Sequence, residues 1–379
     1  MEEHISHYFL ILSAALIVLG LLFIATLSAP QSLQFFGNTN YYLFHQLFSV
    51  AVGLILSIII FKIPLHFLKK VSPILLGINI LLLAAVFLPF IGTKLWGASR
   101  WISIGNNTFQ PSEFLKITVI LYLASWLSNK FSPTVKKNWT FSIKRGHDNF
   151  IHIFLPFLAL LTVISIMLYL QSDISTLGII AVTLITVYFI SDTPLWHTIL
   201  VFLLGLVSTA VFIMIEPYRL QRVLTLLRPE ADPLGKGLQI KQSLIAVGSG
   251  GIFGKGLGMS TQKFGFLPQA MSDSVFAIIG EETGIIGCFI LISLFLLFLY
   301  FGLRIANSTN DTFYKLTAVG IITWITFQAF VNIASIIGLF PITGIPLPFF
   351  SYGGSHLIAE IIGLGLLLKI SRNIKKFSV

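Results

Sequence analysis

The sequence has few charged residues. Only 10% of its 379 residues are Asp, Glu, Lys or Arg, whereas 56% are hydrophobic, and the mean hydropathy is +0.92. About a quarter of the residues of a typical soluble domain are charged. This composition therefore excludes an ordinary soluble protein and predicts an integral membrane protein.

Cysteine, metal-ligand spacing and concentrated basic segments are also scarce. The single cysteine, Cys288, excludes intrachain disulfides. The eight histidines show no spacing typical of a metal site, so we expect none. The net charge of +10 is spread along the chain and not gathered on a basic helix, which argues against nucleic acid and favours anionic lipid or a phosphorylated lipid substrate.

Long apolar runs are abundant. A helix needs about 20 apolar residues to cross a bilayer. We predict an all-α polytopic membrane protein with about ten transmembrane helices, a single domain over residues 1–379, and a large extracytoplasmic loop between helices 7 and 8. The predicted spans are 8–27 (an uncleaved anchor), 43–62, 72–91, 112–128, 151–170, 174–191, 195–215, 273–302, 315–340 and 354–370.

The segment 151–191 allows two interpretations. Only Gln171, Ser172 and Asp173 separate its two apolar runs, so it is either two short spans with a tight turn or one broken, partly re-entrant element. We favour two spans. The short loops at 28–42 and 341–353 lack Lys and Arg, whereas loops on the other side are basic, which predicts cytoplasmic termini and an outward-facing working surface.

Residues 235–283 form a polar, glycine-rich segment within this apolar chain. Its glycines do not fit a phosphate-binding P-loop, because Gly256 stands at the Ser/Thr position. They could instead present backbone N–H groups to an anion, or form a re-entrant turn against neighbouring helices. The excess of basic residues between 216 and 272 favours an anionic ligand at the outer interface over a merely solvated loop.

Three carboxylates follow this segment. Asp273 stands at the predicted outer mouth of the eighth span, in contact with water and headgroups, and is the best candidate for a general base; a helix-capping function is the alternative. Glu281 lies about 12 Å deeper on a helix, and Glu282 lies on another face. We expect both of these glutamates to be paired structural groups.

A second polar cluster precedes the fourth span. Arg100 lies beside Trp101, a combination typical of a membrane interface where a guanidinium binds phosphate, although a plain aromatic anchor explains the tryptophan equally well. Glu113 and Lys116, three residues apart, are placed to pair on one helix face.

These segments resemble a known family. The pieces GASRWISIG, FQPSEFLKI, QSLIAVGSGGIFGKGLG, LPQAMSDSVFAIIGEETGIIG and FPITGIPLPFFSYGGS occur in the order typical of the SEDS family (shape, elongation, division and sporulation), the membrane peptidoglycan glycosyltransferases that include FtsW and RodA. The resemblance covers nearly the whole chain. The pieces QSLIAVGSGG and RPEADPLGKG are more similar to the FtsW type.

The resemblance implies polymerisation of lipid II at the outer face of the bacterial cytoplasmic membrane, with Asp273 as the essential acidic residue. It implies partnership with a class B penicillin-binding protein and other divisome membrane proteins. Mg²⁺ or Mn²⁺ is the candidate assisting cation, without a rigid carboxylate cage. The candidate substrate-binding residues are Arg100, Trp101, Glu113, Lys116, Arg219, Lys255, Lys263 and Ser351.

Three residues depart from the family pattern. Gln269 replaces the usual glutamate, Ser272 often corresponds to threonine, and His356 replaces a serine. We expect activity to survive the first two changes. His356 adds a bulky titratable group near Pro346, Pro348 and Tyr352.

Other functions remain open. A lipid II flippase or other transporter could use the same spans and would place charged groups near the bilayer midplane. An elongation polymerase of the RodA type and a non-catalytic division scaffold are further alternatives. Retention of Asp273 argues against the scaffold.

Overall fold

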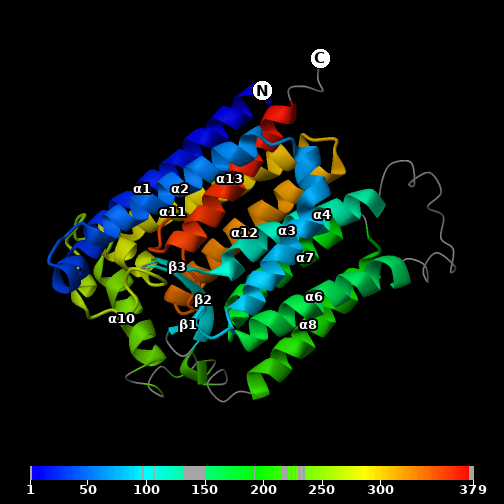
Figure 1. Cartoon of the computed structure of the whole chain (residues 1–379). Coiled ribbons are helices and arrows are strands. Elements are labelled where there is room, and N and C mark those ends of the chain that lie inside the picture. The colour runs from blue at the N-terminus through cyan, green and yellow to red at the C-terminus, as the bar shows by residue number, and fades with distance from the viewer. Residues whose placement is uncertain are drawn as a thin grey trace. The chain divides into compact units, whose positions relative to one another are not determined.

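The computed structural model describes residues 2–95, 98–105, 107–130, 150–191, 193–215 and 235–374, together with 221–222, 224–226, 228 and 232. It is mostly helical (Figure 1). The elements are α1 Glu2–Phe36, α2 Tyr41–Lys62, α3 Leu65–Ala85, β1 Gly92–Leu95, β2 Ala98–Ile104, β3 Asn107–Phe109, α4 Pro111–Lys130, η2 Phe150–Phe154, α6 Leu155–Leu170, α7 Ile174–Ile190, α8 Leu195–Ile215, α10 Lys236–Ser249, η4 Gln262–Phe264, α11 Val275–Asn307, α12 Thr312–Ile336 and α13 Gly354–Ile374.

A helix overlaps each predicted span. Within the described residues, seven helices are long and apolar enough to cross a membrane, and the shorter apolar segments 174–190 and 196–208 add to them. The chain is therefore a polytopic membrane protein. The tight turn at 171–173 joins two separate helices, α6 and α7, which pack against each other, and their crossing the membrane as two spans stays a prediction.

The all-α prediction is wrong for residues 92–109. They form a small antiparallel sheet with strand order β1-β2-β3, in which Thr93 pairs with Trp101 and Ile102 pairs with Phe109. The alternating sequence of β2 suits a pleated strand, but these strands are too short to stand out beside the long apolar runs. The helix α10 was also not predicted, because it lies within the segment expected to be a long loop.

The third helix begins earlier and ends earlier than the predicted span 72–91. It begins directly after Pro64, whose fixed φ suits a helix start. Pro73 lies inside it and cannot donate a hydrogen bond to the Lys69 carbonyl. Two serine hydroxyls donate to that oxygen instead, Ser72 Oγ at 2.9 Å and Ser125 Oγ of α4 at 3.0 Å. These substitute bonds let the helix run through the proline.

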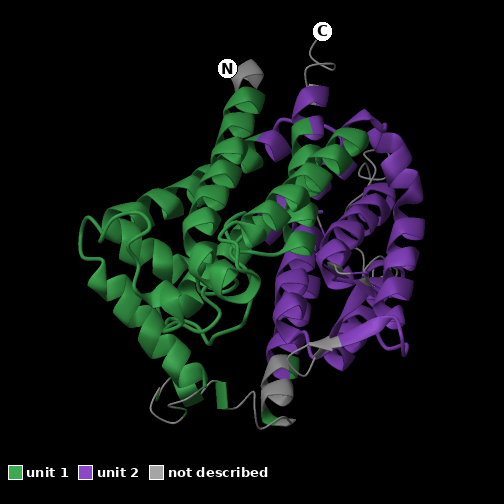
Figure 2. Ribbon diagram, turned by 60° about the vertical axis from the view of Figure 1, so that its left-hand side comes forward, with its two compact units in different colours: residues 1–60, 208–304, 325–368 green, residues 61–207, 305–324, 369–379 purple. Residues whose placement is uncertain are grey.

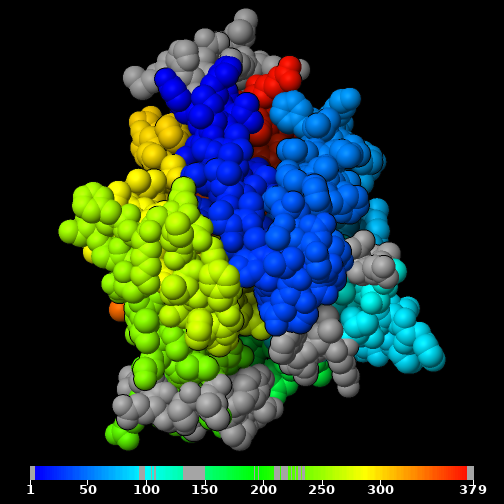
Figure 3. Space-filling view, turned by 90° about the vertical axis from the view of Figure 1, so that its left-hand side faces the viewer, coloured from blue at the N-terminus to red at the C-terminus, as the bar shows by residue number. Residues whose placement is uncertain are grey.

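The chain divides into two compact units that interleave along the sequence (Figure 2). The first unit comprises 1–60, 208–304 and 325–368, and the second comprises 61–207, 305–324 and 369–379. The single domain expected over 1–379 stays a prediction. In the first unit, α1 packs against η4, and Figure 3 shows this side of the molecule. In the second, α4 packs against both α3 and α7.

Candidate active site

Asp273 lies in a braced loop immediately before α11. The Ser272 hydroxyl lies 2.5 Å from Asp273 Oδ1 and 2.9 Å from Gln269 Oε1. The main-chain oxygen of Asp273 accepts a hydrogen bond from Asn332 Nδ2 at 2.8 Å, and the same amide donates to Ile345 O at 2.7 Å. One asparagine of α12 therefore fixes the backbone of Asp273 to the loop that follows α12.

This second loop, 337–353, supports the first through backbone contacts. Tyr352 N donates to Met271 O at 2.8 Å, and Ser351 Oγ donates to Ser272 O while accepting from Leu347 N at 2.8 Å. Ser351 is fully buried. Its hydroxyl therefore supports the Asp273 loop. Ser351 has no exposed surface in this structure at which the predicted substrate contact could form.

The residues that depart from the family pattern are accommodated here. Gln269 adopts a left-handed backbone with φ of 54°, and its carbonyl accepts from Ser274 N at 3.2 Å. His356 is buried, and its Nε2 lies 3.2 Å from Ser351 O. Gln46 of α2 contacts the same loop, with Nε2 donating to Ser351 O at 3.1 Å. His356 thus joins the support of the loop.

The carboxylate of Asp273 has an unusual environment. It is only 8% exposed, less than the open position that the sequence predicted. Four other buried acids, Glu113, Asp173, Glu281 and Glu282, each have a cation within 4.0 Å, and a fifth, Glu360, accepts a hydrogen bond from Phe349 N at 2.8 Å. Asp273 has no such ion pair among the described residues, and no described N–H of α11 donates to its side chain. The described residues therefore show no capping hydrogen bond to this side chain, and the assignment of Asp273 as a general base stays a prediction.

Asp273 acts electrostatically on Lys236. This lysine begins α10, where the carboxylate of Asp232 accepts from the backbone N–H groups of Gly235 and Lys236 at 3.0 and 2.8 Å. Burial lowers the pKa of Lys236, the negative charge of Asp273 opposes this shift, and Arg222 adds to the lowering. Lys236 and Asp273 are thus electrostatically coupled.

A hydrogen-bonded chain leads from Lys236 to the residue after Asp273. Lys236 Nζ donates to Gln239 Oε1 at 3.1 Å, and Gln239 Nε2 donates to Ser274 Oγ at 2.9 Å. In the sequence, Lys236 is one of many basic residues between 216 and 272, and nothing there distinguishes it from the others. The capping pattern of Asp232 before a helix could have located α10, but no sequence signal pairs residues 236 and 273.

Lys255 and Lys263 bind carboxylates of α11. Lys255 Nζ lies 2.6 Å from Glu281 Oε1, and Lys263 Nζ lies 3.4 Å from Glu282 Oε1 and 2.5 Å from Gly258 O. The Lys263 side chain is only 4% exposed. The expected pairing of the two glutamates is present. Lys263 is buried beside Glu282, and the substrate contact predicted for this lysine stays a prediction.

The glycine-rich segment folds back onto α11. Lys255 N and Gly256 N donate to Glu281 O and Glu282 O, both at 3.0 Å. Two N–H groups beyond the break then donate to the loop, Ile285 N to Gly251 O at 2.9 Å and Ile286 N to Ile252 O at 3.2 Å.

Two glycines make this arrangement possible. Gly284 breaks α11 with φ of 68° and ψ of −165°, a conformation open to glycine. Gly254 has φ of 81°, and a Cβ there would collide with the backbone of Glu282. The glycine-rich segment is therefore a turn packed against a neighbouring helix, and whether it re-enters the membrane stays a prediction.

In the second unit, Arg100 of β2 holds the turn between α6 and α7. Its guanidinium lies 3.4 Å from Asp173 Oδ1 and donates to Gln171 O at 3.3 Å and to Ser172 O. Ser112 Oγ donates to the other Asp173 oxygen at 3.1 Å. Arg100 therefore holds this turn in place, and the phosphate contact predicted for it stays a prediction.

Glu113 and Lys116 pair at 2.8 Å in the first turn of α4, as their spacing predicted. Both are buried, and Lys116 Nζ lies 5.2 Å from the ring centre of Trp324 in α12. Trp101 is half-buried in β2. Arg219 lies outside the described residues. Among those described, no group of three or more His, Cys, Asp or Glu side chains could hold a metal ion.

Comparisons with known proteins agree with the motifs. The chain is 37% identical over 362 residues to "Stage V sporulation protein E" of Bacillus subtilis, covering 96% of this chain and 95% of that protein. It is 34% identical over 368 residues to "Probable peptidoglycan glycosyltransferase FtsW" of Nitrosomonas europaea, covering 95% of this chain and 92% of that protein.

Solved structures match over almost the full length. A chain from "Structural coordination of polymerization and crosslinking by a peptidoglycan synthase complex" aligns with a TM-score of 0.75 and 29% identity, covering 97% of each chain. The rod shape determining protein RodA of Thermus thermophilus aligns with a TM-score of 0.68 and 25% identity, covering 96% of each chain. The family model FTSW_RODA_SPOVE, described as "Cell cycle protein", matches residues 6–376, so this chain belongs to the FtsW/RodA/SpoVE family, the SEDS family that its motifs predicted.

Proposed function

We propose that this protein is a peptidoglycan glycosyltransferase that polymerises lipid II into glycan strands. The observation that carries the proposal is Asp273, a buried carboxylate without an ion pair among the described residues, set in a loop that is fixed through its backbone. Family membership and relatives named peptidoglycan glycosyltransferase support it.

In the proposed reaction, the protein takes part in one proton transfer, from the acceptor sugar to Asp273. The 4-hydroxyl oxygen of the acceptor sugar forms a bond to the anomeric carbon of the donor, whose bond to the lipid diphosphate breaks with the electron pair leaving on the diphosphate. Asp273 accepts the hydroxyl proton, a contribution of about 10²–10⁴-fold for a positioned base. Lys236 supplies positive charge next to Asp273, where it can offset charge on the departing diphosphate.

A divalent cation would have to be held mainly by the substrate. Asp273 has no second carboxylate in a metal-binding group among the described residues, so the residues present do not form a cage for Mg²⁺ or Mn²⁺. Such a cation would neutralise diphosphate charge when it arrives with the lipid.

We further propose the membrane arrangement that the sequence predicted. All ten predicted spans would cross the bilayer, with both termini in the cytoplasm and the large loop between the seventh and eighth spans outside. Asp273 would then work at the outer face of the bacterial cytoplasmic membrane. The basic inner loops and the seven long apolar helices support this topology.

The physiological setting follows the named relatives. We propose a role in division or sporulation, since the relatives reported above include FtsW and Stage V sporulation protein E, with RodA-type elongation as the alternative. A class B penicillin-binding protein would supply transpeptidation, together with other divisome membrane proteins. The similar chain from a peptidoglycan synthase complex supports such a partnership.

The transporter alternative loses its structural support. That alternative depends on Asp173, Glu281, Glu282 and Glu360, each of which has an ion pair or a hydrogen bond within the fold. Asp173 pairs with Arg100, while Glu360 Oε2 accepts from Phe349 N at 2.8 Å. A carboxylate that binds and releases a cargo at the midplane would need to be free of such ion pairs and hydrogen bonds to the protein.

Polymerisation by purified protein tests the proposal. The protein would be purified with its cognate class B penicillin-binding protein, supplied with lipid II, and glycan length would be measured on gels. Asp273→Asn should reduce polymer at least 100-fold with an unchanged melting temperature. Asp311→Asn is the matched control, because Asp311 only accepts backbone N–H bonds at the start of α12.

Two results would contradict the proposal. Equal polymer from wild type and Asp273→Asn would remove Asp273 from the chemistry. An inactive wild type that moves lipid II across reconstituted vesicles would establish the transporter instead.

A further inference from the structure

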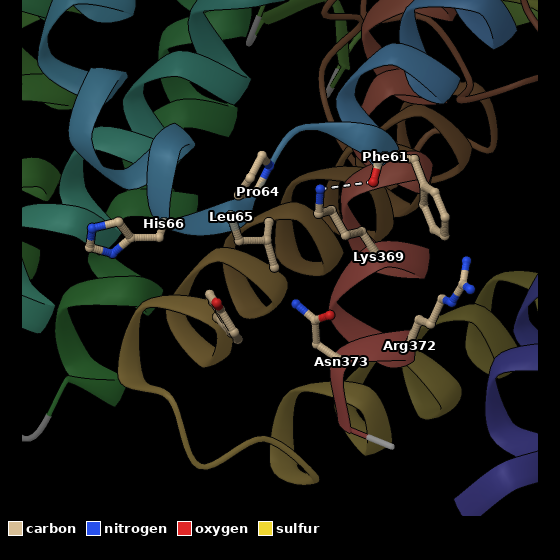
Figure 4. Close-up of a pocket in the computed structure, with 8 residues that line it drawn as sticks. Phe61, Pro64, Leu65, His66, Lys369, Arg372 and Asn373 are labelled. Carbon is tan, nitrogen blue, oxygen red and sulfur yellow. Dashed lines mark hydrogen bonds between the residues drawn. The ribbon is translucent and has the colours of Figure 1, made fainter. Parts of the chain in front are cut away.

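A cavity of about 390 Å³ lies in the second unit (Figure 4). The end of α2 and the start of α3 form one wall, and the last turns of α13 form another. Its apolar surface comes from the α2–α3 turn at Pro64 and Leu65. Its polar lining residues are His66, Tyr314, Lys369, Arg372 and Asn373.

Two cations of α13 border this cavity. Lys369 is buried, and its Nζ donates to Phe61 O at 2.8 Å, a carbonyl in the last turn of α2. The Arg372 guanidinium lies 5.6 Å from the Phe61 ring centre and is exposed at the mouth. No Asp or Glu lines the cavity. The lining therefore carries two positive charges and no carboxylate.

Basic residues at helix C-termini have an ordinary explanation, because they complement the helix dipole and keep inner loops positive. That explanation accounts for Lys369, which binds a terminal carbonyl of α2. It leaves Arg372 and its neighbours without acceptors. In the described part of the chain, the side chains of Arg372, Asn373, Tyr314 and His66 form no hydrogen bond with protein atoms.

We propose that this cavity binds the phosphate of an anionic phospholipid headgroup. A guanidinium with free N–H groups, an amide and a phenol hydroxyl are donors suited to phosphate oxygens. The apolar wall beside them suits the first carbons of a lipid. Under the topology proposed above, the C-terminal end of α13 faces the cytoplasm, where anionic headgroups collect.

Binding would link three elements, since Arg372 and Asn373 belong to α13, His66 to α3 and Tyr314 to α12. An anion held there therefore stabilises the packing of these helix ends. This inference concerns lipid binding and is independent of catalysis by Asp273.

Thermal unfolding in a neutral detergent tests the site. The purified full chain would be titrated with dioleoyl phosphatidylglycerol, with dioleoyl phosphatidylcholine or with sodium phosphate. Phosphatidylglycerol should raise the melting temperature. Arg372→Gln should raise the concentration for half-maximal stabilisation about fivefold, the effect of one basic residue near a headgroup.

Two further variants make the test specific. Arg304→Gln is the matched control, because Arg304 already donates to Tyr300 OH at 3.0 Å and stacks on the Tyr300 ring, and it should leave the titration unchanged. Asn373→Phe fills the cavity while keeping both cations, and it should also weaken the response. Native mass spectrometry would count retained lipid in each variant.

Three outcomes would overturn the proposal. Equal protection of wild type and both cavity variants by phosphatidylglycerol would show only a general lipid effect. Equal protection by phosphatidylcholine would remove the requirement for an anion. Equal protection by sodium phosphate at the same concentration would show that the cavity binds free phosphate and does not require a lipid.

Discussion

Replacing Glu281 with glutamine tests whether the loop 250–264 is held mainly by hydrogen bonds to a buried carboxylate. Glu281 Oε1 accepts from Lys255 Nζ at 2.6 Å, Thr261 Oγ1 at 2.9 Å and Thr261 N at 3.3 Å. Its Oε2 accepts from Ser260 Oγ at 2.5 Å and Gln262 N at 3.3 Å. The glutamate itself is fully buried.

The structure sets the size of the effect. In Glu281→Gln, the new NH₂ group can face Ser260, whose hydroxyl can turn to accept, but the Gln262 N–H loses its acceptor. An unsatisfied buried N–H costs about 1–3 kcal/mol, and the other bonds lose their charge-assisted strength. We expect about 3 kcal/mol of destabilisation in total.

Lys255→Met should be milder. The Lys255 side chain is 36% exposed, so its pair with Glu281 is partly screened by solvent and contributes about 1 kcal/mol or less. Glu281 would keep its four other hydrogen bonds. Lys241→Met is the matched control, because Lys241 is exposed on α10.

The assay is the melting temperature of each purified variant, with glycan polymerisation measured in parallel. Glu281→Gln should melt lowest, Lys255→Met should lie near wild type, and Lys241→Met should match wild type. A Lys255→Met variant that melts as low as Glu281→Gln would refute the reasoning, since the ion pair would then dominate. If Lys255→Met melts like wild type but does not polymerise lipid II, Lys255 binds the substrate, as the sequence predicted.

Three further predictions follow from the same structure. Gly254→Ala should lower the melting temperature strongly, because a Cβ there meets the backbone of α11, whereas Gly258→Ala, with a similar φ of 78° but open space, should be milder. Ser125→Ala should cost about 1 kcal/mol in a stability measurement, since it removes one of two donors to the carbonyl freed by a proline in α3. Burial lowers the pKa of Lys236, so the positive charge of this lysine is present below that pKa and is lost as the pH rises through it. The KM for lipid II should therefore begin to rise at a lower pH than the pKa of an ordinary lysine predicts. Lys236→Gln should abolish this pH-dependent rise in KM.

Much of the architecture could be predicted because apolar length is a local property. Each span appears as a helix, and the turn at 171–173 lies where the sequence placed it. The start of the third helix could not be obtained from apolarity, since it depends on Pro64 and on hydrogen bonds that compensate for Pro73. The small sheet was missed because its strands are short.

The partners of the polar residues were the least predictable feature. Asp273 was identified by its motif, and the pair Glu113–Lys116 by its helical spacing. Lys255 and Lys263, by contrast, find their glutamates 26 and 19 residues away along the chain. Such pairings depend on how the loop folds back at Gly284, which no local pattern specifies.

These pairings also determine which cation can serve the reaction. Arg100 and Lys263 are committed to carboxylates and carbonyl oxygens, so a change in either would disturb the fold before it could report on substrate binding. Lys236 differs, because its ammonium donates to a neutral amide and interacts electrostatically with Asp273. A neutral amide gives up a hydrogen bond more readily than a buried carboxylate gives up an ion pair. An arriving diphosphate can therefore recruit Lys236 at small cost to the fold, and within the described part of the first unit this lysine is the strongest candidate for that role.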